Sequence, residues 1–174
     1  KSFNQDNLAW RAASVVWQLE QQSSYVGVFM PFYSHYYYAF SKLIIQLCHE
    51  SFSKDGKGQT YFAHEAPESQ HHTNQRLLGG RQNLIGFFIG QDVYEHDKET
   101  IVPTQLNSVK IKNQDMFLFN HIPLSKTLEF EMQGTIADAR TKNIPVVNLS
   151  INGRSFEEVG NFVAFWQLYA IYSA

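Results

Sequence analysis

The sequence predicts an α/β fold in which a doubly wound, mostly parallel sheet lies between two layers of helices. Segments with apolar residues three and four positions apart, as in helices, alternate along the chain with short apolar runs of strand length. Such alternation is typical of strand–helix–strand units, whose right-handed crossovers build a three-layer α/β sheet. The 174 residues are enough for a single domain of this kind with its own core.

Three helices are expected in the first half of the chain. The first follows an N-cap at Asp6 or Asn7, because the next apolar residues share one helical face: Leu8, Ala12, Val15, Val16 and Leu19. Ser34 is a candidate N-cap for a second helix over residues 35–50. A third helix is expected over residues 67–79, which begin with Pro-Glu and end at a Gly-Gly pair.

Four short apolar runs have the length and the β-branched or aromatic content of buried strands. They cover residues 25–30, 60–63, 83–89 and 144–149. Residues 91–114 are polar and irregular, and most of them are expected to form a loop.

Two more helices are expected in the second half. One covers residues 125–142, and the last begins after Ser155, which forms a capping-box pattern with Glu158. The final stretch, residues 156–174, is apolar almost all round, which is typical of a helix buried inside a larger body. Because the sequence also begins with Lys1 rather than Met, we expect residues 1–174 to be one domain of a longer two-domain protein.

The composition narrows the class of protein. The net charge is −2, which argues against a nucleic-acid-binding protein, in which basic residues normally predominate. Cys48 is the only cysteine, so the chain has no intrachain disulfide and no cysteine-based zinc site, and a reducing cytoplasm fits. No apolar run is long enough to cross a bilayer, so no membrane partner is expected.

Residues 49–60, HESFSKDGKGQT, are the stretch most suggestive of a functional site. Glu50 comes at the end of an apolar helical run, and a loop rich in glycine and lysine follows. Ligands of open α/β sheets bind at the carboxyl ends of the strands, where we expect the 50–60 loop and the start of the 67–79 helix. The alternative is an ordinary helix end, with a glycine stop and with lysines favoured by the helix dipole.

Glu50 and His71 form the main candidate pair for acid–base chemistry, because a carboxylate and an imidazole near one polyol substrate can divide the work. One moves a proton bound to carbon, and the other moves a proton on oxygen. His72 is adjacent, but neighbouring residues on a helix point about 100° apart, so only one histidine can face a given pocket. The alternative is a pair of surface histidines. A metal site formed with His64 is conceivable, but the spacing matches no standard ligand pattern. The sequence also lacks a complete P-loop and a G-x-S-x-G nucleophile motif.

Several motifs together resemble the second sugar-isomerase (SIS) domain of the glucose-6-phosphate isomerase family, in its bacterial form. The specific block contains Gln46-Leu47, Glu50-Ser51, the run KDGKGQT at 54–60, Gln70-His71 and Gln75. Weaker landmarks are VFMPFYS at 28–34, Gly134-Thr135, Ile144-Pro145 and Val159-Gly160. The resemblance covers nearly the whole chain and implies a three-layer SIS domain.

The resemblance implies roles for individual residues. Glu50 matches the base that carries a proton between carbon 2 and carbon 1 through an enediolate, and His71 matches the histidine that helps to open the sugar ring. Gln46, Lys54 and Gln75 match positions that bind the sugar phosphate substrate. In this family the active site lies at a homodimer interface, and the histidine enters from the neighbouring subunit. The reaction, a step of glycolysis and gluconeogenesis, requires neither a metal nor an organic cofactor.

The sequence also departs from the family. The family's first SIS domain, which holds the phosphate group with a Ser/Thr-rich site, has no counterpart here, and the family's lysine would fall after Ala174. We therefore expect no isomerase activity from this chain alone. A non-catalytic sugar-phosphate-binding SIS domain is the main alternative, and it would have no need for a base. A dimerisation module, with the surface supplied by the tyrosines at 36–38, is a third possibility.

Overall fold

The computed structural model describes residues 6–22, 24–94, 101, 106 and 108–174. Its centre is a parallel sheet whose four described strands have the order β2-β1-β3-β6. The strands are β1 (Gly27–Tyr33), β2 (Thr60–Glu65), β3 (Leu84–Gln91) and β6 (Val146–Ile151). The chain passes from β1 to β2 on one side and then returns past β1 to β3, so the winding direction reverses between β1 and β3.

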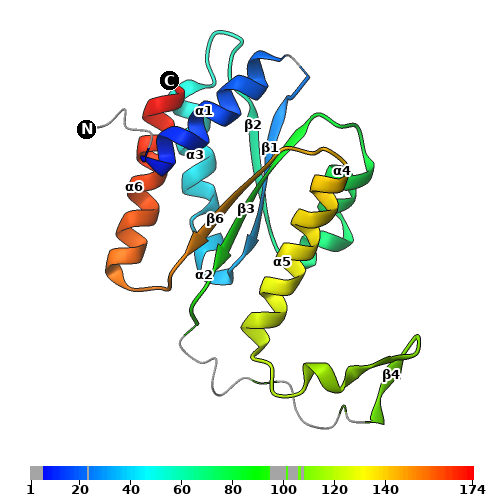
Figure 1. The fold of residues 1–174 in the computed structure, drawn as a ribbon. Helices are drawn as coiled ribbons and strands as arrows, with labels where there is room; N and C mark the ends of the chain where they lie inside the picture. The colour runs from blue at the N-terminus through cyan, green and yellow to red at the C-terminus, as the bar shows by residue number, and fades with distance from the viewer. Residues whose placement is uncertain (1–5, 23, 95–100, 102–105, 107) are drawn as a thin grey trace.

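Helices cover both faces of this sheet (Figure 1). One layer contains α1 (Leu8–Gln21), α3 (Ser41–Phe52) and α6 (Phe156–Ser173). The other contains α4 (Thr73–Gly79) and α5 (Leu124–Thr141). The predicted three-layer α/β fold is therefore confirmed. None of the helices that the structure describes combines the length and the apolar character needed to span a membrane.

The two cores are separated by the sheet, and alternate residues of β1 enter each of them. Val28, Met30 and Phe32 pack toward α1, α3 and α6, whereas Phe29 and Tyr33 pack toward α4 and α5. Side chains of a strand alternate between its two faces, and this explains why β1 is apolar without interruption. Full burial of each large apolar side chain contributes about 1.5–3 kcal/mol.

The first strand was expected to end at Met30, before Pro31, but β1 continues through this proline to Tyr33. Its register with β2 is unbroken, whereas its pairing with β3 omits Met30 and Pro31. Proline has no N–H to donate, so the strand tolerates it by leaving this gap on one side.

Two of the predicted helices are each divided in the structure. Residues 35–50 form α2 (His35–Tyr38) and α3, because Tyr37 is buried and its hydroxyl donates to Gly153 O at 2.7 Å, which fixes the short first helix. Ser34 caps α2 as predicted. Residues 67–79 form the 3₁₀ helix η1 (Glu68–His71) and α4, which are separated at His72, whose φ of −144° is not helical.

The second half of the chain agrees more closely with the predicted helices. α5 and α6 lie within two residues of the expected bounds, and Ser155 Oγ accepts a hydrogen bond from Glu158 N at the start of α6. Much of the expected 91–114 loop lies outside the described residues. The described part includes a small antiparallel pair, β4 (Lys110–Ile111) and β5 (Gln114–Asp115), followed by the 3₁₀ helix η3 (Met116–Phe119).

Candidate functional site

Gln46 and Glu50 lie one turn apart on the exposed side of α3. Gln46 Nε2 donates a hydrogen bond to Glu50 Oε1 at 3.2 Å. The opposite side of the helix is fixed in the core by Ile44 and Cys48, which are buried. Burial raises the pKa of the Cys48 thiol to about 12, so Cys48 has a packing role. The amphipathic pattern of α3 therefore directs the Glu50 carboxylate away from the core, with its amide partner beside it.

The loop that follows α3 is shaped by its backbone. Asp55, Gly56 and Gly58 have φ angles of 55°, 74° and 83°. A Cβ at Gly58 would lie 2.7 Å from Ser53 Cα, so only glycine fits there. Gly58 N also donates to Glu20 Oε1 of α1 at 2.7 Å, which ties the loop to the neighbouring helix. Lys54 begins this loop, and its side chain is exposed.

The position of this loop corrects one expectation. His49 Nε2 accepts a hydrogen bond from Tyr61 N at 2.9 Å, so the end of α3 lies beside the first residues of β2. The 50–60 loop therefore lies at the amino edge of the sheet and not at its carboxyl edge. Ligand sites of open α/β sheets are formed by loops that follow the carboxyl ends of strands, whereas this loop precedes the amino end of β2.

His71 lies beyond the carboxyl end of the same strand, in η1. Its side chain is exposed, and its ring makes no hydrogen bond with any of the described residues. His72 differs, because its Nδ1 accepts from Thr73 N at 2.7 Å and caps α4. The His72 ring also packs edge-on against His64, with ring centroids 4.9 Å apart. The geometry leaves His71, rather than His72, available to a ligand.

The two candidate acid–base residues are not brought together within one chain. β2 has six residues, and at about 3.3 Å per residue the strand spans roughly 20 Å. Glu50, Gln46 and Lys54 lie toward its amino end, whereas His71 lies past its carboxyl end. Gln75 is exposed in α4, on the His71 side of this division.

His64 is the third histidine in this region, and its environment is partly buried. Burial, followed by the proximity of His72, lowers the pKa of His64, while Glu68 acts weakly in the opposite direction. Throughout the part of the chain that the structure describes, no three His, Cys, Asp or Glu side chains gather as they would around a metal ion.

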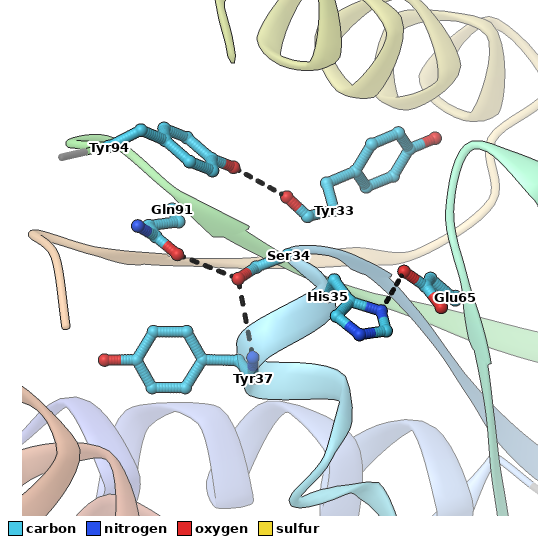
Figure 2. A network of polar contacts seen from close by, with 7 residues as sticks. All are labelled: Tyr33, Ser34, His35, Tyr37, Glu65, Gln91 and Tyr94. Atoms are coloured by element: carbon cyan, nitrogen blue, oxygen red, sulfur yellow. Dashed lines mark hydrogen bonds and ion pairs between the residues drawn. The ribbon is translucent and has the colours of Figure 1, made fainter. Parts of the chain in front are cut away.

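A second polar cluster lies at the carboxyl ends of β1 and β3, where the winding direction reverses (Figure 2). Ser34 Oγ donates to Gln91 Oε1 at 2.8 Å, and the Tyr94 hydroxyl donates to Tyr33 O at 2.9 Å. Ligands of doubly wound folds often bind at such a point. Here these groups bond to one another, and they hold the ends of the two central strands together. The sequence analysis missed Gln91 and Tyr94 because both fall in the stretch expected to be a loop.

Comparison with known proteins supports the fold. No family model matches the sequence, and no curated protein matches it. The crystal structure described as hypothetical protein TT0462 from Thermus thermophilus is similar, with a TM-score of 0.78 and 18% sequence identity. The similarity covers 95% of this chain but only 39% of that longer protein. At this level of identity the similarity establishes that the chain shares the α/β fold of this neighbour.

Proposed function

We propose that the chain is the C-terminal SIS domain of a glucose-6-phosphate isomerase, which interconverts glucose 6-phosphate and fructose 6-phosphate. The observation that carries the proposal is the exposed Glu50 carboxylate at the end of α3. It is paired with Gln46 at 3.2 Å and is followed by a loop whose backbone is fixed at Gly58. A base and an adjacent amide presented by a rigid helix end suit proton transfer at a carbon next to a carbonyl.

The chemistry requires one base that acts twice. Glu50 accepts the proton from C2 of the open-chain aldose, the C–H electron pair forms the C1–C2 double bond, and the carbonyl pair moves onto O1. Glu50 then returns the proton to C1, while the proton on O2 passes to O1 and C2 becomes the ketose carbonyl. Before this step, His71 assists the proton transfers that open the sugar ring.

The separation of Glu50 from His71 favours a homodimer as the active form. A pocket that uses both residues needs Glu50 from one subunit and His71 from the other, because the two lie at opposite ends of β2. Gln46 and Lys54 then lie in the same half of the pocket as Glu50, and Gln75 lies in the half that contains His71. A further domain of the same polypeptide holds the phosphate group, so this chain alone has no activity. A cytoplasmic location of the enzyme is consistent with Cys48, which is buried and forms no disulfide.

Substitution of Glu50 by Gln in the complete polypeptide tests the proposal. The amide keeps the shape of the side chain and removes the base, so turnover should fall by about 10²–10⁴-fold, while sugar phosphate binding measured by calorimetry stays nearly unchanged. Glu157→Gln, an exposed carboxylate in the first turn of α6, is the matched control. Activity of Glu50→Gln within about threefold of the unmodified protein would refute the assignment of Glu50 as the base. Binding of the sugar phosphate without any turnover by the unmodified complete polypeptide would favour the non-catalytic sugar-phosphate-binding alternative.

A further inference from the structure

Three consecutive residues of η1 are held in different ways. The Ser69 side chain is fully buried, and its Oγ donates to Asn74 Oδ1 of α4 at 3.0 Å. Gln70 is half-buried, and its amide turns toward β1 and α5. His71 projects outward. Two anchored neighbours therefore precede the candidate ring-opening histidine.

The Gln70 amide is the start of a directed chain of hydrogen bonds. Its Nε2 donates to Tyr33 Oη at 3.1 Å, and Tyr33 Oη donates to Thr135 Oγ1 at 3.2 Å. Thr135 Oγ1 in turn donates to Glu131 O at 2.9 Å. Each hydroxyl accepts one bond and donates the next, so the bonds polarise one another in the same sense. Gln70 Nε2 also lies 3.4 Å from Thr135 Oγ1 and 3.5 Å from Glu131 Oε2.

Tyr33, which accepts the hydrogen bond from the Gln70 side-chain amide, is held rigidly. The Tyr33 side chain is only 2% exposed, and its ring stacks on Phe88 with centroids 6.4 Å apart. The Tyr33 backbone oxygen is fixed by the Tyr94 hydroxyl. Gln70 therefore ties a short surface segment to the centre of the sheet.

We propose that Gln70 is a positioning residue that fixes η1, and with it His71, through Tyr33 and Thr135. The proposal rests on the isomerase function proposed above. A four-residue 3₁₀ helix is weakly held by its own hydrogen bonds. Proton transfer requires heavy atoms within about 2.6–3.2 Å. A histidine that must reach a pocket in a neighbouring subunit meets this requirement only if the segment carrying it cannot pivot.

The test compares Gln70→Ala, Tyr33→Phe and the double variant in the complete polypeptide. Each single variant should slow turnover of the closed-ring substrate by about tenfold, the factor expected for one lost hydrogen bond, with little change in KM. Turnover of the open-chain substrate should be unchanged, because it bypasses His71. The double variant should be no slower than the slower single variant. Gln133→Ala, an exposed glutamine of α5, is the control. An equal loss on both substrate forms, or no loss, would overturn the proposal.

A second measurement separates this proposal from the isomerase function itself. The backbone N–H of Gln70 donates to Pro67 O at 2.9 Å, and the backbone N–H of His72 donates to Ser69 O at 3.2 Å. Hydrogen exchange at these two backbone groups therefore reports on η1 directly. Gln70→Ala should accelerate this exchange by about tenfold. Unchanged exchange would contradict the anchoring. Faster exchange in Gln70→Ala, together with a complete polypeptide that does not isomerise glucose 6-phosphate, would sink the proposed function and leave the anchoring of η1 established.

Discussion

The two ends of β2 carry the two halves of the candidate site, and they are built differently. At the amino end, the loop after α3 owes its shape to its backbone: three residues have positive φ, and Gly58 leaves no room for a side chain. At the carboxyl end, η1 owes its position to side chains, through Ser69 with Asn74 and Gln70 with Tyr33. The structure of the loop after α3 should therefore be sensitive to substitution of its glycines. The position of η1 should be sensitive to the loss of polar side chains.

Gly58→Ala should have the largest effect on stability. The new Cβ meets Ser53 Cα at 2.7 Å, and the φ of 83° is already unfavourable for alanine, so we expect a loss of about 2–4 kcal/mol. Gly56→Ala is the matched control, because its φ is 74° but its Cβ would meet nothing within 4 Å. It should cost only about 1 kcal/mol. Urea unfolding of the purified chain measures both, and equal losses would show that strain alone, without the clash, shapes the loop.

His72→Ala should have a smaller effect on stability, and His71→Ala almost none. His72 caps α4, and the loss of a helix cap costs about 0.5–2 kcal/mol. His71 makes no such contact with the described residues, so its removal should instead lower turnover of the closed-ring substrate in the complete polypeptide. If His72→Ala does the greater damage to ring opening, the assignment of His71 is wrong by one residue.

The smallest expected effect concerns pH. Because the pKa of His64 in the folded chain is below its ordinary value, the unfolded chain binds a proton first as the pH falls below about 6.5. The stability linked to the neutral His64 ring is fully present above that pH. It is lost progressively as the pH falls toward the pKa of His64 in the folded chain. His64→Phe should therefore flatten the dependence of stability on pH just below about 6.5, measured by urea unfolding at a series of pH values. An unchanged pH dependence in His64→Phe would contradict this role of His64.

The sequence was sufficient for the elements whose apolar pattern is locally clear. The four strands, the Ser34 cap and the start of α6 were predicted because each depends on residues close together in the chain. The break before α3 was not predicted, because it follows from a distant partner, Gly153, which the Tyr37 hydroxyl contacts. The break at His72 was missed because histidine is not among the residues usually expected to cap a helix. The link between Tyr33 and Thr135 joins residues 102 positions apart, beyond any local pattern.

For the candidate site, the spacing of Glu50 and His71 along the chain did not reveal how far apart they lie. Their separation depends on the direction of β2. The loop after α3 leads into the amino end of this strand, and η1 follows its carboxyl end. Gln70 appeared in the sequence only as the neighbour of His71, and its role became visible when β1 and α5 were placed beside η1.

The central claim is that one pocket draws Glu50 and His71 from different subunits. It is tested most directly by mixing two variants of the complete polypeptide, Glu50→Gln and His71→Ala, and allowing their subunits to exchange. The assay uses the closed-ring substrate, on which both variants are expected to be defective. In a mixed dimer, one pocket receives both defects and the other receives neither. Half of the dimers are mixed after random exchange, so activity should return to about one quarter of that of the unmodified enzyme. If both residues of a pocket came from one chain, every pocket would keep a defect, and mixing would restore no activity.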